Sequence, residues 1–304
     1  MLINFRIFAF SNEKKVMSNI LITGANGQLG CCLRDLSHGD ERNHYFYTDV
    51  DELDITSLDQ IEDYVSKHDI EVIINAAGYT AVDRAENDVE RCFLINAEAT
   101  RYLAQVTKRH EIFLVHISTD YVFDGSVDIP HKPDDPINPQ SVYGKSKAAG
   151  EQAIFEADCH AVIIRTSWLY SEYGGNFVKT MLRLGAEKDE LRVVDDQIGG
   201  PTYAGDLAQL IMTIVRQRSF IEGTKIYHFA DQGAVSWCDF ARQIMRNASL
   251  SCRVLPVSTA EYGAVAPRPA FSVFDLSAVA QDFSFEIPQW RESLQKCMQK
   301  IGNQ

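Results

Sequence analysis

The sequence predicts an α/β protein with a doubly wound, Rossmann-type parallel sheet and a smaller, integrated C-terminal lobe. Three observations lead to this fold class: short apolar runs alternate with amphipathic stretches, a glycine-rich turn follows the first run, and small polar residues end a later run. Near-continuous apolar runs are typical of strands covered on both faces by helices. Their repeated alternation with helices is typical of a parallel sheet.

Five apolar runs are predicted to form strands of this sheet, over residues 20–23, 45–48, 72–75, 113–117 and 161–165. Between them we expect helices over residues 28–36, 57–68, 89–109 and 141–155. Ser57 and Ser141 stand where helix N-caps belong. Beyond residue 167 we expect a further strand over 225–229 and helices over 176–184, 205–216, 237–245 and 291–301.

The composition, 45% hydrophobic and 23% charged, is that of an ordinary globular protein. A formal net charge of -13 argues against binding to nucleic acid or to an anionic membrane, because both attract a basic face. No apolar run reaches the roughly 18–20 residues of a membrane span. The seven cysteines are scattered without metal-ligand spacing, so we expect reduced thiols in a cytoplasmic protein.

The turn after the first predicted strand carries glycines at a GxxGxxG spacing, namely Gly24, Gly27 and Gly30. Such a turn brings backbone N–H groups and a helix N-terminus close to a pyrophosphate, and a Cβ atom would block the approach. Glycines also mark ordinary turns. The strand before this turn and the helix after it favour a dinucleotide-binding site.

Asp49 ends the second predicted strand, about 20 residues past the last glycine, where an acidic residue can bond a ribose 2′-hydroxyl. A solvated loop acid is the alternative. No Arg or Lys stands beside Asp49 in the sequence, so by charge NADH should be accepted, and NADPH only if its 2′-phosphate projects to solvent. Other residues expected at the cofactor are Asn26, Gln28, Leu29, Asp54, Ile55, Ala76, Ala77, Gly78, Tyr79 and Thr80.

Tyr143 and Lys147 have a YxxxK spacing on a predicted helix, and residues four apart share one helix face. A free phenol titrates near pH 10. A nearby cation, together with the positive nicotinamide ring of an oxidised cofactor, would lower its pKa and fit the phenol for proton transfer. A Tyr/Lys pair on a solvated helix is the alternative. Its place after a glycine turn in a doubly wound fold favours an active-site pair.

The apolar run at 113–117 leads into Ser118, Thr119 and Asp120. The C-terminal end of a strand is where an open parallel sheet places its ligands. A hydroxyl there can polarise a substrate carbonyl. Side chains alternate along a strand, so Ser118 and Thr119 cannot easily both face the site, and periodicity leaves the choice open.

Together these motifs resemble the extended short-chain dehydrogenase/reductase family, and within it the members that act on nucleotide sugars. The similarity extends from residue 19 to about residue 275. The similar segments are 75–86 (NAAGYTAVDRAE), 117–125 (ISTDYVFDG), 143–151 (YGKSKAAGE), 165–170 (RTSWLY), 176–184 (NFVKTMLRL) and 195–204 (DDQIGGPTYA).

The resemblance implies an NADPH- or NADH-dependent enzyme that reduces the C4 ketone of dTDP-4-dehydro-β-L-rhamnose, the last step in forming dTDP-L-rhamnose. It implies that Tyr143 donates the proton and that Lys147 binds the nicotinamide ribose. It also implies that Thr119, rather than Ser118, is the catalytic hydroxyl.

For the substrate, the resemblance implies that Asp120, Trp168 and Tyr143 contact the sugar and that Arg268 pairs with the diphosphate. A core tryptophan and an exposed loop arginine are the alternatives. Some relatives form dimers bridged by magnesium through glutamates, and a homodimer stays open here. The matching positions are Cys32 and Gly205, neither of which suits a hard cation, so we expect no metal.

The pattern divides the chain into three parts. We expect residues 1–16 to be an extension outside the fold, with Met17 as the natural start. Residues 17–167 are the predicted dinucleotide-binding domain with the catalytic residues, and residues 168–304 the predicted substrate-binding lobe, some segments of which return to the first domain.

Two other functions stay open at this stage. One is a nucleotide-sugar epimerase or dehydratase on the same scaffold, for which Asp120 beside Thr119 is the argument. The other is a non-catalytic, cofactor-binding regulatory subunit, against which the presence of both Tyr143 and Lys147 argues.

Overall fold

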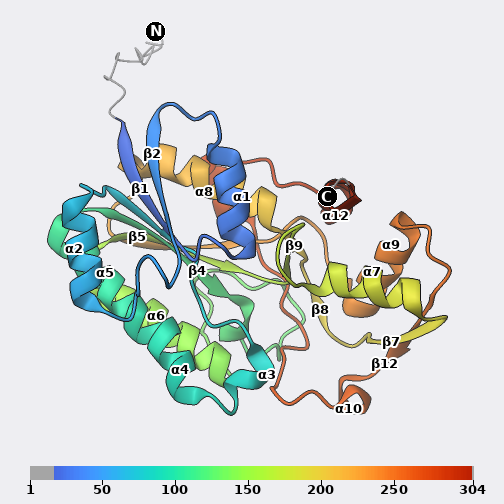
Figure 1. Ribbon diagram of the computed structural model, residues 1–304. Coiled ribbons are helices and arrows are strands. Elements are labelled where there is room, and N and C mark those ends of the chain that lie inside the picture. The colour runs from blue at the N-terminus through green and yellow to red at the C-terminus, as the bar shows by residue number, and fades with distance from the viewer. Residues whose placement is uncertain (1–16, 303–304) are drawn as a thin grey trace, which may run out of the picture.

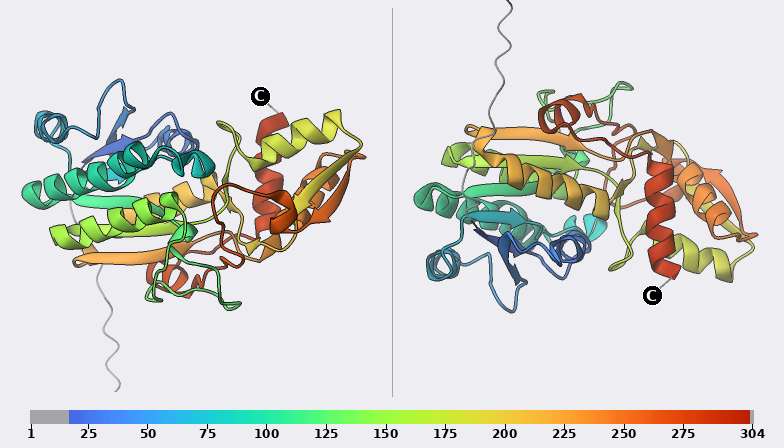
Figure 2. Two further views of the ribbon diagram at one scale, coloured as in Figure 1. Left: turned by 90° about the horizontal axis from the view of Figure 1, so that it is seen from below. Right: turned by 90° about the horizontal axis from the view of Figure 1, so that it is seen from above.

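The computed structural model describes residues 17–302, and the extension expected over residues 1–16 lies outside that part of the chain. A six-stranded sheet with helices on both faces forms the larger lobe (Figure 1). A second lobe lies beside one end of the sheet (Figure 2). The predicted doubly wound α/β fold is confirmed.

The sheet has the strand order β10-β5-β4-β3-β1-β2, and every adjacent pair is parallel. All strand C-termini therefore lie at one edge. The winding reverses between β1 and β3, and the crevice at such a reversal is where open α/β sheets bind ligands. The strands are β1 (Ser18–Thr23), β2 (Asn43–Thr48), β3 (Val72–Asn75), β4 (Phe113–Thr119), β5 (His160–Thr166) and β10 (Thr224–Phe229).

Helices bury both faces of the sheet. Ile20 and Ile22 of β1 belong to the cluster under one pair of helices, whereas Leu21 belongs to the cluster under the other three. Because successive side chains point to opposite faces, this double burial explains the unbroken apolar runs. The first pair is α1 (Gln28–Ser37) and α8 (Ala204–Gln217), and the other three are α2 (Leu58–Lys67), α5 (Ala99–His110) and α6 (Val142–Ala157).

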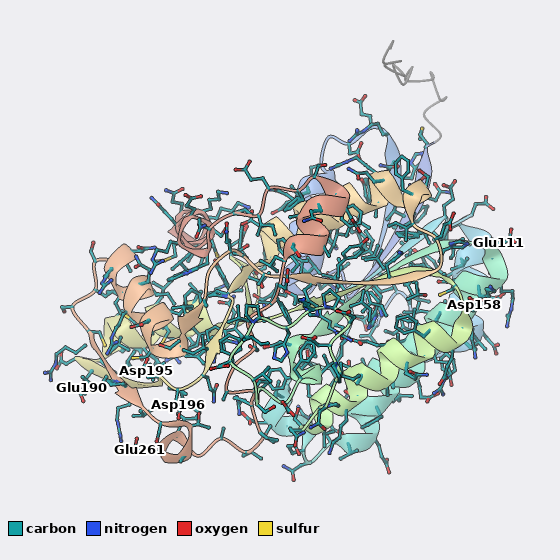
Figure 3. The ribbon with its side chains drawn as sticks, turned by 180° about the vertical axis from the view of Figure 1, so that it is seen from behind. Glu111, Asp158, Glu190, Asp195, Asp196 and Glu261 are labelled. Carbon is teal, nitrogen blue, oxygen red and sulfur yellow. The ribbon has the colours of Figure 1, made fainter. Side chains whose placement is uncertain are left out.

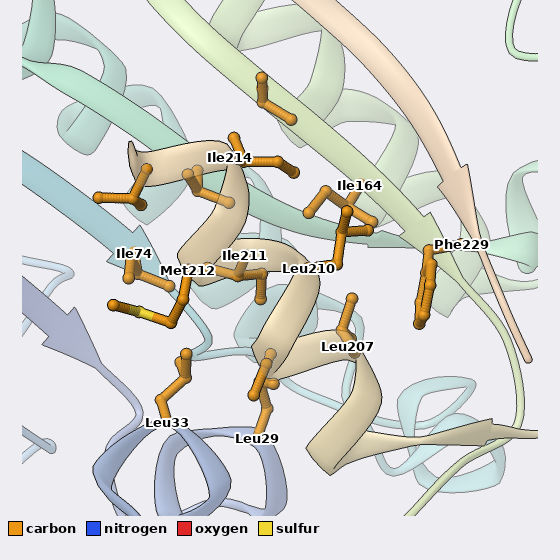
Figure 4. Close-up of a cluster of buried hydrophobic side chains, with 14 of the residues drawn as sticks. Leu29, Leu33, Ile74, Ile164, Leu207, Leu210, Ile211, Met212, Ile214 and Phe229 are labelled. Atoms are coloured by element: carbon orange, nitrogen blue, oxygen red, sulfur yellow. The ribbon is translucent and has the colours of Figure 1, made fainter. Parts of the chain in front are cut away.

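Helix α8 brings the C-terminal half of the chain into the core of the first half. Its buried face packs between the sheet and α1, as Figure 4 shows for Leu207, Leu210, Ile211 and Ile214 beside Ile74, Ile164, Leu29 and Leu33. Each such side chain contributes about 1.5–3 kcal/mol by burial. Strand β10 also comes from this half and pairs with β5 along its whole length. The two halves therefore share one hydrophobic core.

The prediction of one continuous α-helix over residues 89–109 is wrong for the turn at residues 94–98. Helix α4 (Val89–Phe93) passes into a π-helical turn, η1 (Leu94–Glu98), before α5 begins. Asn96 in this turn binds the backbone N–H and C=O of Tyr79 at 2.8 and 3.0 Å and the hydroxyl of Ser146 at 2.9 Å. The turn accompanies these contacts between distant segments, which helical periodicity does not predict.

The second lobe is built from helices around three two-stranded sheets. The sequence predicted the three long helices but not the strands, which are only two to five residues long and carry no repeating pattern. The helices are α7 (Phe177–Glu187), α9 (Trp237–Asn247) and α12 (Trp290–Gly302). The strand pairs are β6 (Leu169–Tyr170) with β9 (Thr202–Tyr203), β7 (Glu190–Val194) with β12 (Arg253–Val257), and β8 (Ile198–Gly199) with β11 (Val235–Ser236).

Short helical segments complete the description: α3 (Val82–Ala85), η2 (Asp120–Val122), η3 (Arg218–Phe220), α10 (Thr259–Tyr262) and α11 (Ser277–Phe283). Acidic side chains gather on the second lobe near β7 and α10, where Figure 3 labels Glu190, Asp195, Asp196 and Glu261. This surface fits the acidic composition and would repel nucleic acid phosphates. Among residues 17–302, no helix is long and apolar enough to cross a membrane.

Gly30 has no room for a side chain, so Gly30→Ala tests the glycine turn. A Cβ atom would lie 2.5 Å from Cα of Ala25 and closer still to the carbonyl oxygen of Gly24. Because these neighbours are backbone, we expect a loss of roughly 1–3 kcal/mol in the free energy of unfolding, measured by urea denaturation. Gly302→Ala, with open space around it, is the control. Equal midpoints for both variants would contradict the tight packing.

Candidate active site

The C-terminal edge of the sheet opens onto a groove made of two neighbouring cavities. One, of about 540 Å³, is lined by residues after β3, β4 and β5, by α6 and by the segment before α7. The other, of about 470 Å³, lies beyond the glycine turn, near the end of β2. The two cavities share Gly27, Ala76, Ala77 and Gly78.

Tyr143, Lys147 and Thr119 meet in the first cavity. Helix α6 starts at the expected N-cap, because the Ser141 hydroxyl accepts from the backbone N–H of Gly144 at 3.0 Å. Tyr143 and Lys147 follow one turn apart on one face of the helix. Thr119 lies close enough to Tyr143 for its hydroxyl to lower the pKa of the phenol. The structure thus brings together the three residues predicted to be catalytic.

Ser118 is held by different partners. Its hydroxyl donates to Glu151 at 2.5 Å, and Glu151 accepts from the guanidinium of Arg165 at 2.9 and 2.7 Å. All three residues are buried. Thr119 instead donates to Asp120 at 3.1 Å, and both Ser118 and Thr119 line the cavity. The alternation along β4 separates the two hydroxyls, as the sequence analysis required.

Desolvation governs the ionisation of Tyr143 and Lys147. It raises the pKa of Tyr143 to about 12, against the lowering effect of the Thr119 hydrogen bond. In this cavity the cost of removing a phenolate from water outweighs the favourable contacts. Desolvation also lowers the pKa of Lys147 to about 8. At neutral pH Tyr143 carries its proton and is fit to act as a proton donor.

Asp120 lies deep in the same cavity, 2% exposed. Desolvation raises its pKa from the ordinary 3.8 to about 6, although hydrogen bonds from Ser272 and Thr119 favour the carboxylate. The site therefore contains a second group that can hold a proton near neutral pH, next to the predicted catalytic hydroxyl.

The residues predicted to bind the cofactor follow the groove. Gly24 adopts a left-handed φ of 65°, and a Cβ atom there would lie 2.6 Å from the backbone nitrogen of Ala77. The backbone N–H of Asn26 donates to Asp49 at 3.1 Å, and Gly30 packs beneath the turn. Lining the first cavity are Gly27, Gln28, Leu29, Ala76, Ala77, Gly78, Tyr79 and Thr80, and lining the second are Gly24, Asp49, Asp54 and Ile55.

Arg91 is a neighbour of this groove that sequence reasoning missed. It is exposed on α4 and lines the same cavity as Asp49. No cation stands beside Asp49 in the chain, but the fold brings one from a distant helix. The end of the groove near β2 therefore offers both a carboxylate and a guanidinium.

Trp168 lines the first cavity from the second lobe and is also packed into that lobe. Its φ of 47° is unusual for a bulky residue. The indole stacks on Trp237 with ring centroids 3.6 Å apart and an interplanar angle of 10°. A Cβ atom on Gly199 would lie 2.6 Å from this ring, so glycine there makes room for it. The sequence analysis missed both Trp237 and Gly199.

Gln28 connects the two lobes at the cavity, another contact that the sequence did not reveal. Its side-chain oxygen accepts hydrogen bonds from Ser171 at 3.0 Å and Asn176 at 2.9 Å. Asn176 also caps α7 by accepting from the backbone N–H of Lys179 at 3.1 Å. The glycine-turn helix and α7 are thereby held in fixed relation across the cavity.

Arg268 lines a different cavity from the other predicted substrate residues, although its charge acts on Tyr121 in the Tyr143 cavity. It lines a cavity of about 620 Å³ that has no lining residue in common with the Tyr143 cavity and also contains Trp237 and Tyr262. Its guanidinium donates to Asp83 at 2.7 and 3.1 Å. A diphosphate at Arg268 would have to share this cation with Asp83.

Cys32 and Gly205, the positions considered for a metal, lie on another cavity with Asp35, Asp206 and Lys300. Within residues 17–302, no group of three or more His, Cys, Asp or Glu side chains is arranged to hold a metal ion. All seven cysteines are free thiols.

The sequence model of the family described as RmlD substrate binding domain matches residues 17–303. The chain belongs to this family. A member from Aggregatibacter actinomycetemcomitans, a dTDP-4-dehydrorhamnose reductase, is 43% identical over 289 residues, which cover 91% of this chain and 97% of that protein. The resemblance predicted from the motifs is therefore confirmed.

Solved structures of RmlD-type reductases have the same fold. The dTDP-4-dehydrorhamnose reductase of Bacillus anthracis, in complex with NADP, superposes with a TM-score of 0.89 at 39% identity and covers 94% of this chain and 100% of that chain. That of Clostridium acetobutylicum gives a TM-score of 0.89 at 37% identity, with 93% and 99% covered. The similarity includes both lobes.

Asp120→Asn should stabilise the folded protein at neutral pH at the expense of activity. Between about pH 4 and pH 6 the carboxyl ionises in the unfolded chain but not in the folded one, which favours unfolding. Above pH 6 the difference in free energy of unfolding between Asp120→Asn and the parent protein is constant, at about 3 kcal/mol for a rise of the pKa from 3.8 to about 6. Melting curves should show an advantage of the variant that grows from pH 4 to pH 6 and then levels off.

Asp124→Asn is the matched control for Asp120→Asn. Hydrogen bonds from Ser126 lower the pKa of Asp124, so its replacement should not stabilise the protein above pH 6. An advantage of Asp120→Asn that does not change with pH would contradict the buried, protonated carboxyl.

Proposed function

We propose that this protein reduces the C4 ketone of dTDP-4-dehydro-β-L-rhamnose to dTDP-L-rhamnose with NADPH or NADH. The observation that carries the proposal is the meeting of Tyr143, Thr119 and Lys147 in one cavity at the C-terminal edge of the sheet. Similarity over nearly the full chain to reductases that carry this substrate in their names supports the choice of sugar.

The groove fits a dinucleotide. Gly27 is the N-cap of α1, no side chain caps that helix, and its first turn carries no acidic residue. Its terminal N–H groups are therefore available to a pyrophosphate. Gly24, Gly27 and Gly30 would carry the pyrophosphate turn, and Asp49 would bond the ribose of the adenosine. The bound nicotinamide supplies the hydride for C4.

The chain's own residues supply the proton and hold the substrate. Tyr143 protonates the C4 oxygen as negative charge develops there. The Thr119 hydroxyl, which donates to Asp120 at 3.1 Å, turns to donate its hydrogen bond to the same oxygen. Lys147 binds the nicotinamide ribose and places positive charge beside the phenol. Asp120 and Trp168 bind the sugar. Arg268 contacts the diphosphate while its guanidinium also donates to Asp83.

We also propose a cytoplasmic location, which the free thiols support. The homodimer suggested by the family resemblance stays a prediction, and sedimentation of the purified protein tests it.

Tyr143→Phe tests the proton donor. We expect turnover to fall by about 10²–10⁴-fold while cofactor affinity is largely kept, because the ring remains and only the acid is lost. The assay follows nicotinamide absorbance with substrate made in situ and quantifies dTDP-L-rhamnose. Tyr227→Phe is the control, since that phenol binds Asp282 outside the groove. Near-normal turnover in Tyr143→Phe would remove the central claim.

The same assay separates a reductase from the two other functions. A reductase consumes one NADPH or NADH per sugar, whereas an epimerase or dehydratase returns its cofactor unchanged. A regulatory subunit binds the cofactor and consumes none.

Arg91→Ala tests the cofactor preference. If the guanidinium meets the 2′-phosphate, its loss should raise the Kd for NADPH about tenfold and leave the Kd for NADH nearly unchanged. Fluorescence titration with each cofactor measures both constants. Arg84→Ala removes an exposed arginine of α3 outside the groove and serves as the control. Equal changes for the two cofactors would show that Arg91 does not read the phosphate.

A further inference from the structure

A line of buried polar side chains runs from the sheet to the predicted active-site lysine. The Thr23 hydroxyl, the Asn75 amide, the His116 imidazole and the Lys147 ammonium follow one another at 2.8, 3.0 and 3.2 Å. They come from β1, β3, β4 and α6, and none is more than 4% exposed. Of these four residues, only Lys147 has a role in the proposed function.

His116 and Ser118 occupy alternate positions of β4 and both face α6. His116 contacts Lys147, and Ser118 contacts Glu151 one turn later on the helix. Lys147 also donates to the carbonyl oxygen of Ile117 at 2.5 Å. Two of the three N–H donors of the ammonium are thus directed at β4, and one is left for the cavity.

The chemistry of an ammonium fixes the role of the imidazole. Lys147 in its charged form can only donate, so Nε2 of His116 must accept and Nδ1 must carry the ring proton. That proton needs an acceptor, which the amide oxygen of Asn75 supplies after a half-turn that exchanges its oxygen and nitrogen. The Thr23 hydroxyl then accepts from the amide nitrogen instead of donating to the amide oxygen. With the amide nitrogen toward Nδ1, as it lies in the structure, Nε2 would instead donate to a neutral amine.

We propose that His116 is a positioning residue for the reductase: its neutral imidazole accepts through Nε2 from the charged Lys147 and aims the remaining N–H into the cavity. The inference rests on the proposed function, in which that N–H binds the nicotinamide ribose. Asn75 and Thr23 act behind His116 by fixing the ring and its tautomer, as a second layer of hydrogen bonds does for ligating histidines.

Electrostatics in the interior agree with this assignment. Burial, reinforced by the charge of Lys147, holds the pKa of His116 well below its usual range, so the ring is neutral at pH 7. Burial lowers the pKa of Lys147 to about 8, while Glu151 on the same helix and Cys92 on α4 raise it. Loss of the Nε2 acceptor would remove support from the charged amine, so the pKa of Lys147 would fall further.

Three substitutions of His116 separate its contacts. His116→Phe keeps a ring and removes both nitrogens. His116→Gln offers an amide oxygen near the position of Nε2, whereas His116→Asn reaches only the position of Nδ1 and so keeps the Asn75 contact alone. His228→Phe removes another buried histidine of the same sheet, one that contacts Arg165 rather than Lys147, and is the matched control.

We expect kcat to fall about tenfold or more in His116→Phe and His116→Asn, with much of it restored in His116→Gln. The alkaline limb of the pH profile of kcat should move to lower pH in His116→Phe and His116→Asn. It should stay in place in His116→Gln and His228→Phe. Purely structural damage would lower kcat without moving this limb. A limb that stays in place in folded His116→Phe, or moves to higher pH, would overturn the inference.

A second measurement keeps the inference separate from the proposed function. NMR titration of labelled lysine gives the pKa of Lys147 without any turnover. A lower value in His116→Phe than in the parent protein supports the inference even if the sugar is another one, and an unchanged value overturns it. Absence of NADPH and NADH oxidation in the parent protein would count against the proposed function alone.

Discussion

The ion pair between Arg165 of β5 and Glu151 of α6 fixes the position of the helix that carries Tyr143 and Lys147. Both side chains are about 3% exposed, and the guanidinium meets the carboxylate through two nitrogens. Removing one partner of such a pair leaves a buried charge, which costs about 3–5 kcal/mol. A shift of α6 along the sheet would separate the two side chains and leave both charges buried without a partner. The pair therefore resists any sliding of α6 against β5. Tyr143 and Lys147 lie on that helix, and their reach toward Thr119 depends on it.

Burial also determines which side chains of the cavity are charged at neutral pH. Tyr143 and Asp120 are desolvated and hold protons at higher pH than in water, whereas Lys147 releases its proton at lower pH. A phenol that stays protonated beside a buried amine is suited to give a proton to a developing oxyanion. At neutral pH the cavity therefore offers a proton donor.

Patterns local in the chain predicted much of this protein. The doubly wound sheet followed from apolar runs buried on both faces, and Ser57 and Ser141 cap the helices where expected. The YxxxK pair and the strand-end hydroxyl are local too, because one helix turn and one strand end bring them into reach. The choice of Thr119 over Ser118 needed either the family resemblance or the contact of Ser118 with Glu151.

Contacts between distant segments escaped the sequence analysis. Arg91 reaches the end of the groove near β2 from another helix, Arg268 is paired with Asp83, and Trp168 stacks on Trp237. Nothing in the spacing of these residues predicts such partners. The π turn at 94–98 is local, but the bonds of Asn96 to Tyr79 and Ser146 that accompany it join distant segments.

The path of the chain between the lobes limits how the molecule can move. After β5 the chain enters the second lobe, returns through α8 and β10 to complete the sheet, and then goes back to end in α12. Several covalent crossings, together with the hydrogen bonds that Gln28 receives, join the lobes around the groove. A wide hinge opening would strain all of these connections at once. Ligands should therefore enter and leave mainly by local displacement of loops, and the two lobes should unfold as one cooperative unit.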